Sequence, residues 1–533
     1  MSGNLSEAQQ FIEAHSQRVQ PLFRESNLAS WEAATTGSEE AIQRSAEIRT
    51  RVKQIYSEKE SFESVRRLRA GGPTGDALID RQLLLLEHAY TENQLPPEMI
   101  EELTFRESEL ERIFYNFRAT VDGKELSNNG LRDLLQGELN NARRREVWEA
   151  SKAIGARIAP LLLDLVRRRN QAARDLGFTN YYSMELELQE IDEDELFALL
   201  ADFSDRSDEA FRELKGRLDA ELAARYGVSE NEVRPWHWDD FFSQEAPAFG
   251  EVDLDPIFAP LDHEAVARDY FAEIGLPVED VLERSDLHER DGKDQHAFCT
   301  DIDREGDVRM LCNLRPNERW MGTLLHELGH AVYDKYIPRT IPYLLRTAAH
   351  TLSTESIAMY FGRLTRDPEW LRQTIGTTLD PEQEAAVHEQ QRLSMLVAMR
   401  WMLVMVHFEQ AMYANPDRED LNSLWWDFVE KYQLIRRPEG RNEPDWATKL
   451  HLSLAPVYYH NYLLGELMAS QLTHAMRELP GGSADAGFFL QEQIFSRGAT
   501  LPWNELLREA TGEPLSAGHF VDQFVGEPLA GGA

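Results

Sequence analysis

The chain has 533 residues, of which 93 are acidic and 56 basic, and its formal net charge at pH 7 is −37. This charge argues against nucleic acid as a partner, because phosphate binding requires basic patches. The first residues lack the basic and apolar regions of a secretory signal. The most apolar run, 393–408, contains Arg400 and His407, so it predicts a buried core helix and no membrane span. Two cysteines cannot form a disulfide framework, and we expect free thiols in a cytoplasmic enzyme.

Helical patterns dominate the whole chain, and no long linker or internal repeat divides it. We therefore expect a mainly α fold in a single unit, 1–533. The Gly-rich break at 71–75 separates an N-terminal pair of charged helices from the rest. These helices form a solvated outer layer on the simplest interpretation.

Two apolar, partly β-branched runs, 296–303 and 308–312, flank a turn signal at 304–307 and predict a β-hairpin. The edge of such a hairpin can bind an extended peptide as an additional strand. A hairpin that only packs against the fold fits the pattern equally well. Cys299 and Cys312 lie on its two arms and could face one another.

The most informative segment is His326-Glu327-Leu328-Gly329-His330. On a helix, histidines four residues apart point to nearly the same side, and the glutamate between them can reach a water on the metal without ligating it. Asn317 is a candidate N-cap, and apolar residues recur at helical spacing at Trp320, Leu324, Leu325, Leu328 and Val332. The segment therefore predicts a zinc site for metal-assisted hydrolysis.

Catalytic zinc needs a third protein ligand, for which Glu355, 25 residues beyond His330, is the best candidate. It lies in the segment 351–361, where Leu352, Ile357 and Phe361 indicate a helix that Ser353 or Thr354 could cap. His350 is a rival ligand, although a role beside the metal or at the surface suits it better. Asp334, one turn after His330, either orients an imidazole or is a solvated helix charge.

A third cluster occupies 445–451 and 456–462. Peptide hydrolysis builds negative charge on the carbonyl oxygen, which a Tyr hydroxyl or a His N–H can stabilise. This cluster supplies both donors, with His451 before Tyr459 and Tyr462, which would share one helix face. Buried amphipathic packing is the alternative explanation for any single residue here.

The pattern of the zinc segment with Glu355 resembles the gluzincin metallopeptidases. More specifically, the chain resembles the angiotensin-converting-enzyme family of peptidyl-dipeptidases, with a secondary likeness to thimet oligopeptidase and oligoendopeptidase F. Weaker matches at 11–14, 29–33, 495–505 and 511–514 extend the likeness nearly end to end. It implies a large helical peptidase with a small β-hairpin beside the active-site helix and a deep central channel. Residues 1–120 would form a helical lid and 121–533 the catalytic region, with zinc-binding helices at about 317–365 and a substrate-binding segment at about 445–475.

The resemblance also implies a role for each candidate residue. One zinc ion per chain would be held by His326, His330 and Glu355, with Glu327 as the base. The other roles it implies are substrate contact by His296 and Ala297, binding of the substrate's C-terminal carboxylate by Lys449 and Tyr459, and stabilisation of the oxyanion by His451 and Tyr462. The expected activity is release of C-terminal dipeptides from oligopeptides.

The chain departs from the family at three positions. The spacing after His451 is one residue longer, which makes Tyr458 a rival of Tyr459. Asn461 stands where the animal enzymes carry a chloride-binding Arg. Met359 stands where the family has an acidic residue, so a zinc-binding histidine must be oriented by another group.

Three hypotheses remain. The first is a zinc peptidyl-dipeptidase, and the second is a thimet-type oligoendopeptidase, which the segments 297–300 and 461–465 also fit. The third is an inactive peptide-binding protein, against which the intact Glu327 argues. The oligomeric state is left open.

Overall fold

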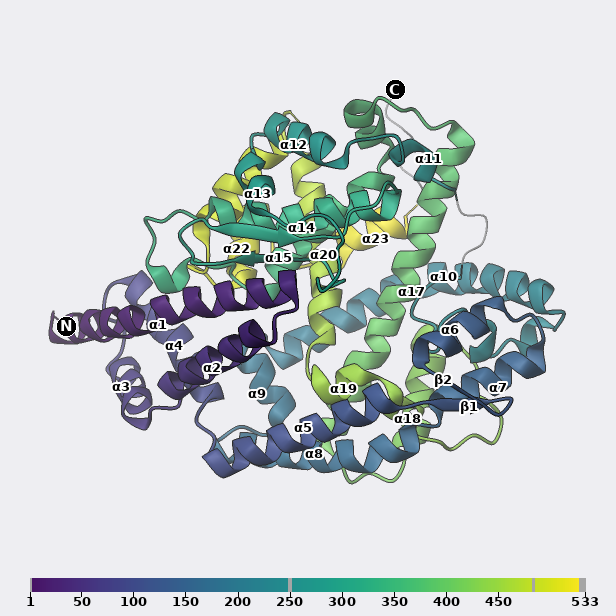
Figure 1. Cartoon of the computed structure of the whole chain (residues 1–533), viewed down its shortest axis with the longest axis horizontal. Coiled ribbons are helices and arrows are strands. Elements are labelled where there is room, and N and C mark those ends of the chain that lie inside the picture. Colours follow the sequence, from purple (N-terminus) through teal and green to yellow (C-terminus); the bar gives the residue numbers. More distant parts are fainter. Residues whose placement is uncertain (1, 248–251, 482–484, 527–533) are drawn as a thin grey trace. The chain divides into compact units, whose positions relative to one another are not determined.

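Helices make up 70% of the computed structural model, which describes residues 2–247, 252–481 and 485–526. Within these residues the strands form two short antiparallel hairpins (Figure 1). The mainly α fold is therefore confirmed. The chain divides into two units: unit 1 comprises Met1–Gln94, Val252–Glu384 and Leu464–His519, and unit 2 comprises Leu95–Glu251, Ala385–Leu463 and Phe520–Ala533.

The N-terminal part of unit 1 contains α1 (Ser2–Thr36), α2 (Glu39–Tyr56), α3 (Lys59–Ala70) and α4 (Ala77–Glu92). Three helices precede the Gly-rich break, so the predicted pair was wrong. Gly37 adopts a φ of 68°, and the Ser38 hydroxyl caps α2 by accepting from the Ala41 N–H. Ser57 is the C-cap of α2, and its backbone N–H and its hydroxyl both donate to the Lys53 carbonyl.

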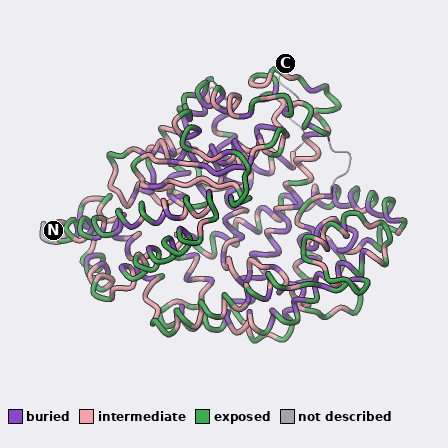
Figure 2. The backbone as a smooth tube through the Cα atoms, viewed as in Figure 1, coloured by how far each residue is buried: buried purple, intermediate pink, exposed green. Residues whose placement is uncertain are grey.

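Buried and exposed residues alternate along α1 and α2 (Figure 2). Buried residues of the two helices, including Val19, Leu22 and Ile48, meet in one apolar cluster, whereas Ala8 and Ile12 of α1 pack with α3 and α4. Amphipathic spacing thus explains why two highly charged helices pack as a pair. The remaining elements of unit 1 are α11 (Asp255–Phe258), α12 (His263–Glu273), α13 (Glu279–Arg284), β3 (Phe298–Asp301), β4 (Val308–Leu311), α14 (Glu318–Tyr336), α15 (Thr351–Gly362), α16 (Pro368–Trp370), α20 (Tyr459–Arg477, in unit 1 from Leu464), α21 (Ala486–Phe489), α22 (Trp503–Thr511) and the start of α23 (Gly518–Phe524).

Unit 2 is built around long helices and one small hairpin. In chain order its elements are α5 (Pro97–Asn116), β1 (Ala119–Val121), β2 (Lys124–Leu126), α6 (Asn128–Gly137), α7 (Asn141–Lys152), α8 (Gly155–Asp175), α9 (Tyr181–Leu188), α10 (Glu193–Tyr226), α17 (Pro381–Ala414, in unit 2 from Ala385), α18 (Leu421–Phe428) and α19 (Leu450–Leu454). The strands β1 and β2 pair antiparallel.

The apolar run 393–408 lies within α17, and its side chains are largely buried, as predicted. Leu396 and Leu403 are fully buried, and each contributes about 1.5–3 kcal/mol relative to an exposed leucine. Arg400 is buried as well, because its guanidinium donates to the Ser204 carbonyl at 3.0 Å and to the Ser207 hydroxyl at 2.7 Å. In the ranges that the structure describes, none of the helices combines the length and apolar character needed to cross a membrane.

The predicted hairpin is present as β3 and β4, which pair antiparallel with Cys299 opposite Met310. Arg304 and Gly306 take the left-handed conformations of its turn, and the Asp301 carboxylate accepts from the N–H groups of Asp303 and Arg304. The other side of β4 forms a bridge from Leu311 to Asp286. Among the described residues β3 is therefore the edge strand of this sheet, and at its end the Asp301 carbonyl accepts from the Asn27 side chain at 2.9 Å.

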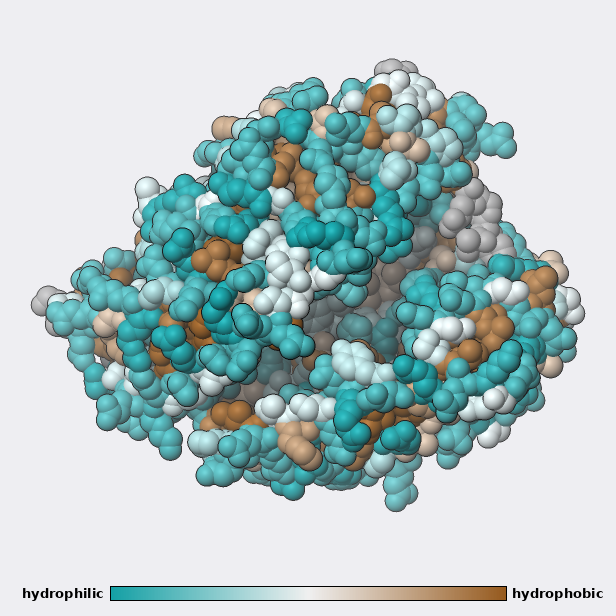
Figure 3. Space-filling view, in the orientation of Figure 1, coloured by the Kyte–Doolittle hydropathy of each residue, from teal (hydrophilic) through white to brown (hydrophobic). Residues whose placement is uncertain are grey.

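Hydrophilic residues cover most of the face shown in Figure 3, with small apolar patches between them. This surface agrees with the net charge of −37. A lid over residues 1–120, a catalytic region over 121–533 and a deep channel stay predictions.

Candidate active site

Helix α14 carries the first part of the candidate site. The Asn317 side chain caps it by accepting from the Trp320 N–H at 3.0 Å, as predicted. Leu324, Leu325 and Leu328 are fully buried and hold one side of the helix in the core. Their spacing leaves the next face of α14 for His326 and His330.

Helix α15 packs against α14 at Gly329, in the middle of the zinc segment. A Cβ at Gly329 would lie 2.7 Å from the Cα of Ala358, so only glycine permits this approach of the two backbones. The close contact brings the α15 side chains next to the two histidines. Gly329 thus has a structural reason to stand between them.

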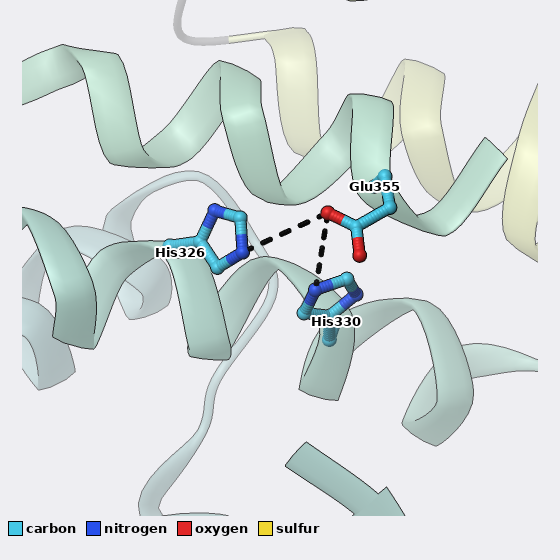
Figure 4. A group of neighbouring side chains, drawn as sticks. All are labelled: His326, His330 and Glu355. Carbon is cyan, nitrogen blue, oxygen red and sulfur yellow. Dashed lines mark ion pairs between the residues drawn. The ribbon is translucent and has the colours of Figure 1, made fainter. Parts of the chain in front are cut away.

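Figure 4 shows His326, His330 and Glu355 pointing toward one another from these two helices. The Glu355 Oε2 lies 3.9 Å from the Nε2 of His326 and 3.9 Å from the Nε2 of His330. One ligand atom from each residue lies within 4.8 Å of the others. The predicted ligand set is therefore assembled in unit 1.

Burial lowers the pKa of His326 to about 4 and that of His330 to about 3, so both imidazoles are neutral near pH 7. Neutral imidazole is the form that ligates a metal, and the contacts to Glu355 are then not ion pairs. The Nδ1 of His330 lies 2.8 Å from the Thr354 hydroxyl, and His326 forms a hydrogen bond to the backbone of Ala358. Helix α15 thus supplies the carboxylate and also orients both rings.

These residues fit a zinc ion. Two neutral imidazoles and one carboxylate are the donors of many catalytic zinc sites, in which each ligand atom lies about 2.0–2.2 Å from the metal. Ligand atoms 3.9 Å apart can share one such ion. The orienting hydrogen bonds direct the Nε2 atoms toward the common point.

Glu327 is buried, with 6% of its surface exposed. Burial and the nearby charge of Glu355 raise its pKa to about 8. A carboxyl group with a pKa near neutrality can both accept and return a proton, which suits a general base that later acts as an acid.

The structure separates the alternatives that the sequence left open around α15. His350 is the N-cap of this helix, and its Nδ1 accepts from the Leu352 N–H at 3.0 Å. The expectation that Ser353 or Thr354 caps the helix was wrong, because the helix begins earlier, at Thr351. Asp334 is partly buried, and its pKa is raised to about 7 by burial and by Asp301. The group within hydrogen-bond distance of the His330 Nδ1 is Thr354, and not Asp334.

His296 and Ala297 lie directly before β3, which begins at Phe298, so the pair is not in the strand itself. The His296 side chain is 95% exposed, and its backbone N–H donates to the Asp294 carboxylate at 3.0 Å. Cys299 and Cys312 are free thiols.

The candidate carboxylate site is in unit 2. Lys449 precedes α19 and is buried, and its Nζ donates to the Gln244 side-chain carbonyl at 2.6 Å. The ammonium lies 5.0 Å from the ring of Phe242, 5.1 Å from Trp401 and 5.7 Å from Tyr459. Burial lowers its pKa to about 8, so this lysine gains from any anion that approaches it.

The predicted donors also lie in unit 2. The His451 ring is 5.1 Å from that of Tyr459, and burial lowers the pKa of His451 to about 4. The Tyr459 hydroxyl accepts from the Trp401 indole N–H at 3.3 Å. The Tyr462 ring lies 5.6 Å from Tyr459 and 5.1 Å from Tyr458. Of the two rival tyrosines, Tyr459 is thus the one beside Lys449.

Sequence reasoning missed Gln244, Phe242 and Trp401, which surround Lys449. They come from segments about 205 and 48 residues away in the chain, and no motif marks them. It also missed Thr354 as the partner of His330. Met359 signalled that another partner was needed but did not identify it.

Comparison with known proteins gives two family matches. Residues 2–233 match the model described as angiotensin-converting enzyme, and residues 282–526 match that of peptidase family M3. An angiotensin-converting enzyme of Haematobia irritans exigua is 26% identical, covering 51% of this chain and 48% of that protein. That of Mesocricetus auratus is 22% identical over 96% of this chain and 42% of its own length. The chain thus spans less than half the length of these curated relatives.

The helical fold, the histidine and glutamate cluster and these matches make the chain similar to metallopeptidases of the gluzincin type. Within that class, the chain is similar to the family that includes angiotensin-converting enzyme.

Proposed function

We propose that the chain is a zinc-dependent peptidyl-dipeptidase, with one zinc ion per chain, that releases C-terminal dipeptides from oligopeptides. The observation that carries the proposal is the convergence of His326, His330 and Glu355 beside the buried Glu327. Two further observations support dipeptide release as the activity. They are the family resemblance and the group of residues around Lys449 in unit 2.

A zinc ion held by His326, His330 and Glu355 would polarise the scissile carbonyl and lower the pKa of a water molecule. Glu327 takes a proton from the water that attacks the carbonyl carbon, and it returns this proton to the leaving amine as the C–N bond breaks. In the family-based assignment, the hydroxyl of Tyr462 and the imidazole of His451 donate to the oxyanion.

The edge of β3 suits an extended substrate, whose backbone can pair with it through main-chain hydrogen bonds. His296 and Ala297 continue this edge toward the N-terminus and keep their proposed contact with the substrate. The free carboxylate of the peptide would replace the Gln244 carbonyl beside Lys449 and accept from the Tyr459 hydroxyl. A carboxylate at this position stabilises the charged form of the buried Lys449. The neutral Gln244 amide stabilises that charge less.

A second candidate is an oligoendopeptidase. The match to peptidase family M3 over residues 282–526 favours it, because that range contains both zinc-binding helices and the segment around Lys449. The two candidates differ in one property. An exopeptidase requires the free carboxylate of its substrate, whereas an endopeptidase does not.

Paired peptides with a free or amidated C-terminus test this difference. We expect mass spectrometry to detect successive dipeptides from the free peptide, loss of this activity with a chelator, and at least tenfold slower cleavage of the amide, since a charged hydrogen bond contributes about 1.5–3 kcal/mol. Equal cleavage of both peptides at internal bonds would instead identify an oligoendopeptidase. Absence of any chelator-sensitive cleavage would instead support the third hypothesis, that of an inactive peptide-binding protein.

Three further parts of the proposal have indirect support. The helices of 1–120 act as a lid, as the resemblance implies. Oligopeptides are the partners, which follows from the peptidase family. The compartment is the cytoplasm, since Cys299 and Cys312 are free thiols.

A further inference from the structure

The chain reverses between the two helices that carry the proposed oxyanion donors. Helix α19 ends at Leu454 and contains His451, and α20 begins at Tyr459 and contains Tyr462 (Figure 1). Residues 455–458 connect them, and both donors belong to unit 2. The conformation of this connection therefore sets how the imidazole and the phenol hydroxyl lie relative to one another.

Val457, within the connection, has an unusual backbone. Its φ is 52°, in the left-handed region, which a β-branched residue adopts only under strain. The residue is also buried, with 1% of its surface exposed. Such a conformation persists only where the surrounding structure holds it, so the connection needs support from another part of the fold.

Glu409 of α17 supplies this support. Its Oε1 accepts from the Val457 N–H at 2.9 Å, and the two residues are 48 positions apart in the chain. Both are buried, so solvent has little access to the bond. Burial raises the pKa of the Glu409 carboxyl to about 8. At pH 7 this carboxyl is therefore mainly neutral, and it acts through its hydrogen bond more than through its charge.

Two further side chains of unit 2 hold the same region. On the α19 side, the buried Arg169 of α8 donates to the Ser453 carbonyl at 2.9 Å. On the α20 side, the side-chain carbonyl of Gln189 accepts from the side chains of Asn461 and His460, each at 3.2 Å. Both ends of the connection are thus anchored by hydrogen bonds to distant segments.

We propose that Glu409 is a positioning residue, which holds Val457 in its left-handed conformation and so sets the direction of α20 and the place of the Tyr462 hydroxyl. It acts through Val457 and not on the reacting atoms. The inference rests on the proposed function, from which Tyr462 has its role. The hydrogen bond from the Trp401 indole N–H to the Tyr459 hydroxyl, at 3.3 Å, reports the start of α20 without any substrate.

Two substitutions separate the hydrogen bond from the bulk of the side chain. Glu409→Gln keeps an acceptor in the shape of the neutral carboxyl, and its kcat for peptide cleavage should equal that of the parent. Glu409→Met removes the acceptor, so we expect kcat to fall at least about tenfold with a smaller change in KM, as for a displaced oxyanion donor.

Two control variants change the same helix. Glu382→Gln makes the same chemical change at an exposed position of α17, and Gln410→Met removes a hydrogen bond to Glu193 at the position after Glu409. Both should keep the parent kcat. A loss in Glu409→Gln as large as that in Glu409→Met, or an unchanged kcat in Glu409→Met, overturns the proposal.

Val457→Gly distinguishes positioning from general packing, because glycine adopts a positive φ without strain. In the Val457→Gly protein, Glu409→Met should lower kcat by at most about threefold, since the two residues act as a coupled pair. An equal fold-loss in both backgrounds would show that Glu409 acts through packing alone and overturns the proposal. Glu409→Asp, which withdraws the acceptor by one methylene, serves the same comparison if the methionine variant does not fold.

The NMR resonance of the Trp401 indole N–H separates failure of this inference from failure of the proposed function. This resonance, assigned by its loss in Trp401→Phe, should move in Glu409→Met and stay in place in Glu409→Gln, whether or not the chain cleaves peptides. An unmoved resonance in Glu409→Met overturns the positioning role even if the chain is a peptidase. A moved resonance in a chain without peptidase activity supports the positioning role and overturns only the proposed function.

Discussion

The zinc segment of unit 1 and the Lys449 segment of unit 2 are built in different ways. In unit 1, two consecutive helices supply the three candidate ligands, the base and both orienting hydrogen bonds. In unit 2, Lys449 is held by Gln244, Phe242 and Trp401, which belong to distant parts of the chain. The first site depends on helical spacing and the second on long-range packing.

The two sites should therefore respond differently to substitution. A metal site on two helices is fixed by a few atoms, so the loss of one hydrogen bond changes ligand orientation directly. Lys449 is buried among aromatic rings and has no carboxylate within ion-pair distance among the described residues. Its charge is therefore available to bind an anionic ligand. The predictions below test this contrast.

The largest effect is expected from Glu327→Gln, which keeps the shape of the side chain but removes its proton-accepting oxygen. We expect kcat/KM for peptide cleavage to fall about 10²–10⁴-fold, the usual contribution of a general base. Zinc content and thermal stability should be retained, and Glu382→Gln should behave as the parent. Undiminished turnover by Glu327→Gln would remove this residue from the mechanism.

Lys449→Met should reduce kcat/KM about 100-fold for peptides with a free C-terminus, since a charged hydrogen bond contributes about 1.5–3 kcal/mol. Amidated peptides should be nearly unaffected, because they make no such bond in either protein. Lys124→Met, at an exposed position of β2, controls for loss of charge. An equal loss for both kinds of peptide would show that Lys449 acts through packing alone.

Thr354→Val removes the hydroxyl beside the His330 Nδ1 without changing the side-chain shape. We expect zinc affinity, measured by competition with a chelator, to fall about 10- to 30-fold, whereas Thr354→Ser should keep nearly all of it. The same affinity for the valine and serine variants would mean that the hydroxyl does not orient the ring.

The last effect is on stability and not on activity, and it concerns Lys152, whose pKa burial lowers from 10.5 to about 7. The charged groups that act on it are Asp445, Asp240, Arg441 and Lys449. Above about pH 7 the Lys152 amine is protonated in a smaller fraction of folded molecules than of unfolded ones. The lysine's contribution to stability should therefore rise with pH up to about 10.5, by at most about 1.4 kcal/mol per pH unit.

Urea unfolding near pH 7 and pH 9 measures this dependence. Lys152→Met cannot titrate, so its unfolding free energy should change less between the two pH values and should exceed that of the parent most at the lower one. Identical pH profiles for the two proteins would contradict the shifted pKa.

The sequence predicted that His326, His330 and Glu355 come together, because residues four apart on a helix lie on nearly the same face. Histidines four residues apart need only a helix to share a face, and Asn317 and the apolar positions of α14 indicated that helix. The hairpin was also predicted from local signals, namely a turn between two apolar, partly β-branched runs.

What the sequence did not predict depends on contacts between distant segments. The partner of His330 could not be chosen, because Asp334 on the same helix and Thr354 on the next one satisfy the same requirement, and only packing decides between them. Gln244 had no signal either, since a single glutamine has no motif. The start of α15 was missed because histidine is an uncommon N-cap, and serine and threonine stood nearby.

The close approach at Gly329 has a thermodynamic consequence. Because one helix supplies a ligand and the hydrogen bonds that orient the other two, metal occupancy and the docking of α15 on α14 form a single equilibrium. A metal that binds only the docked state stabilises it by RT ln(1 + [Zn]/Kd). The amide hydrogens of α15 should then exchange with solvent faster after chelation, because an ion held by these ligands would also link the two helices.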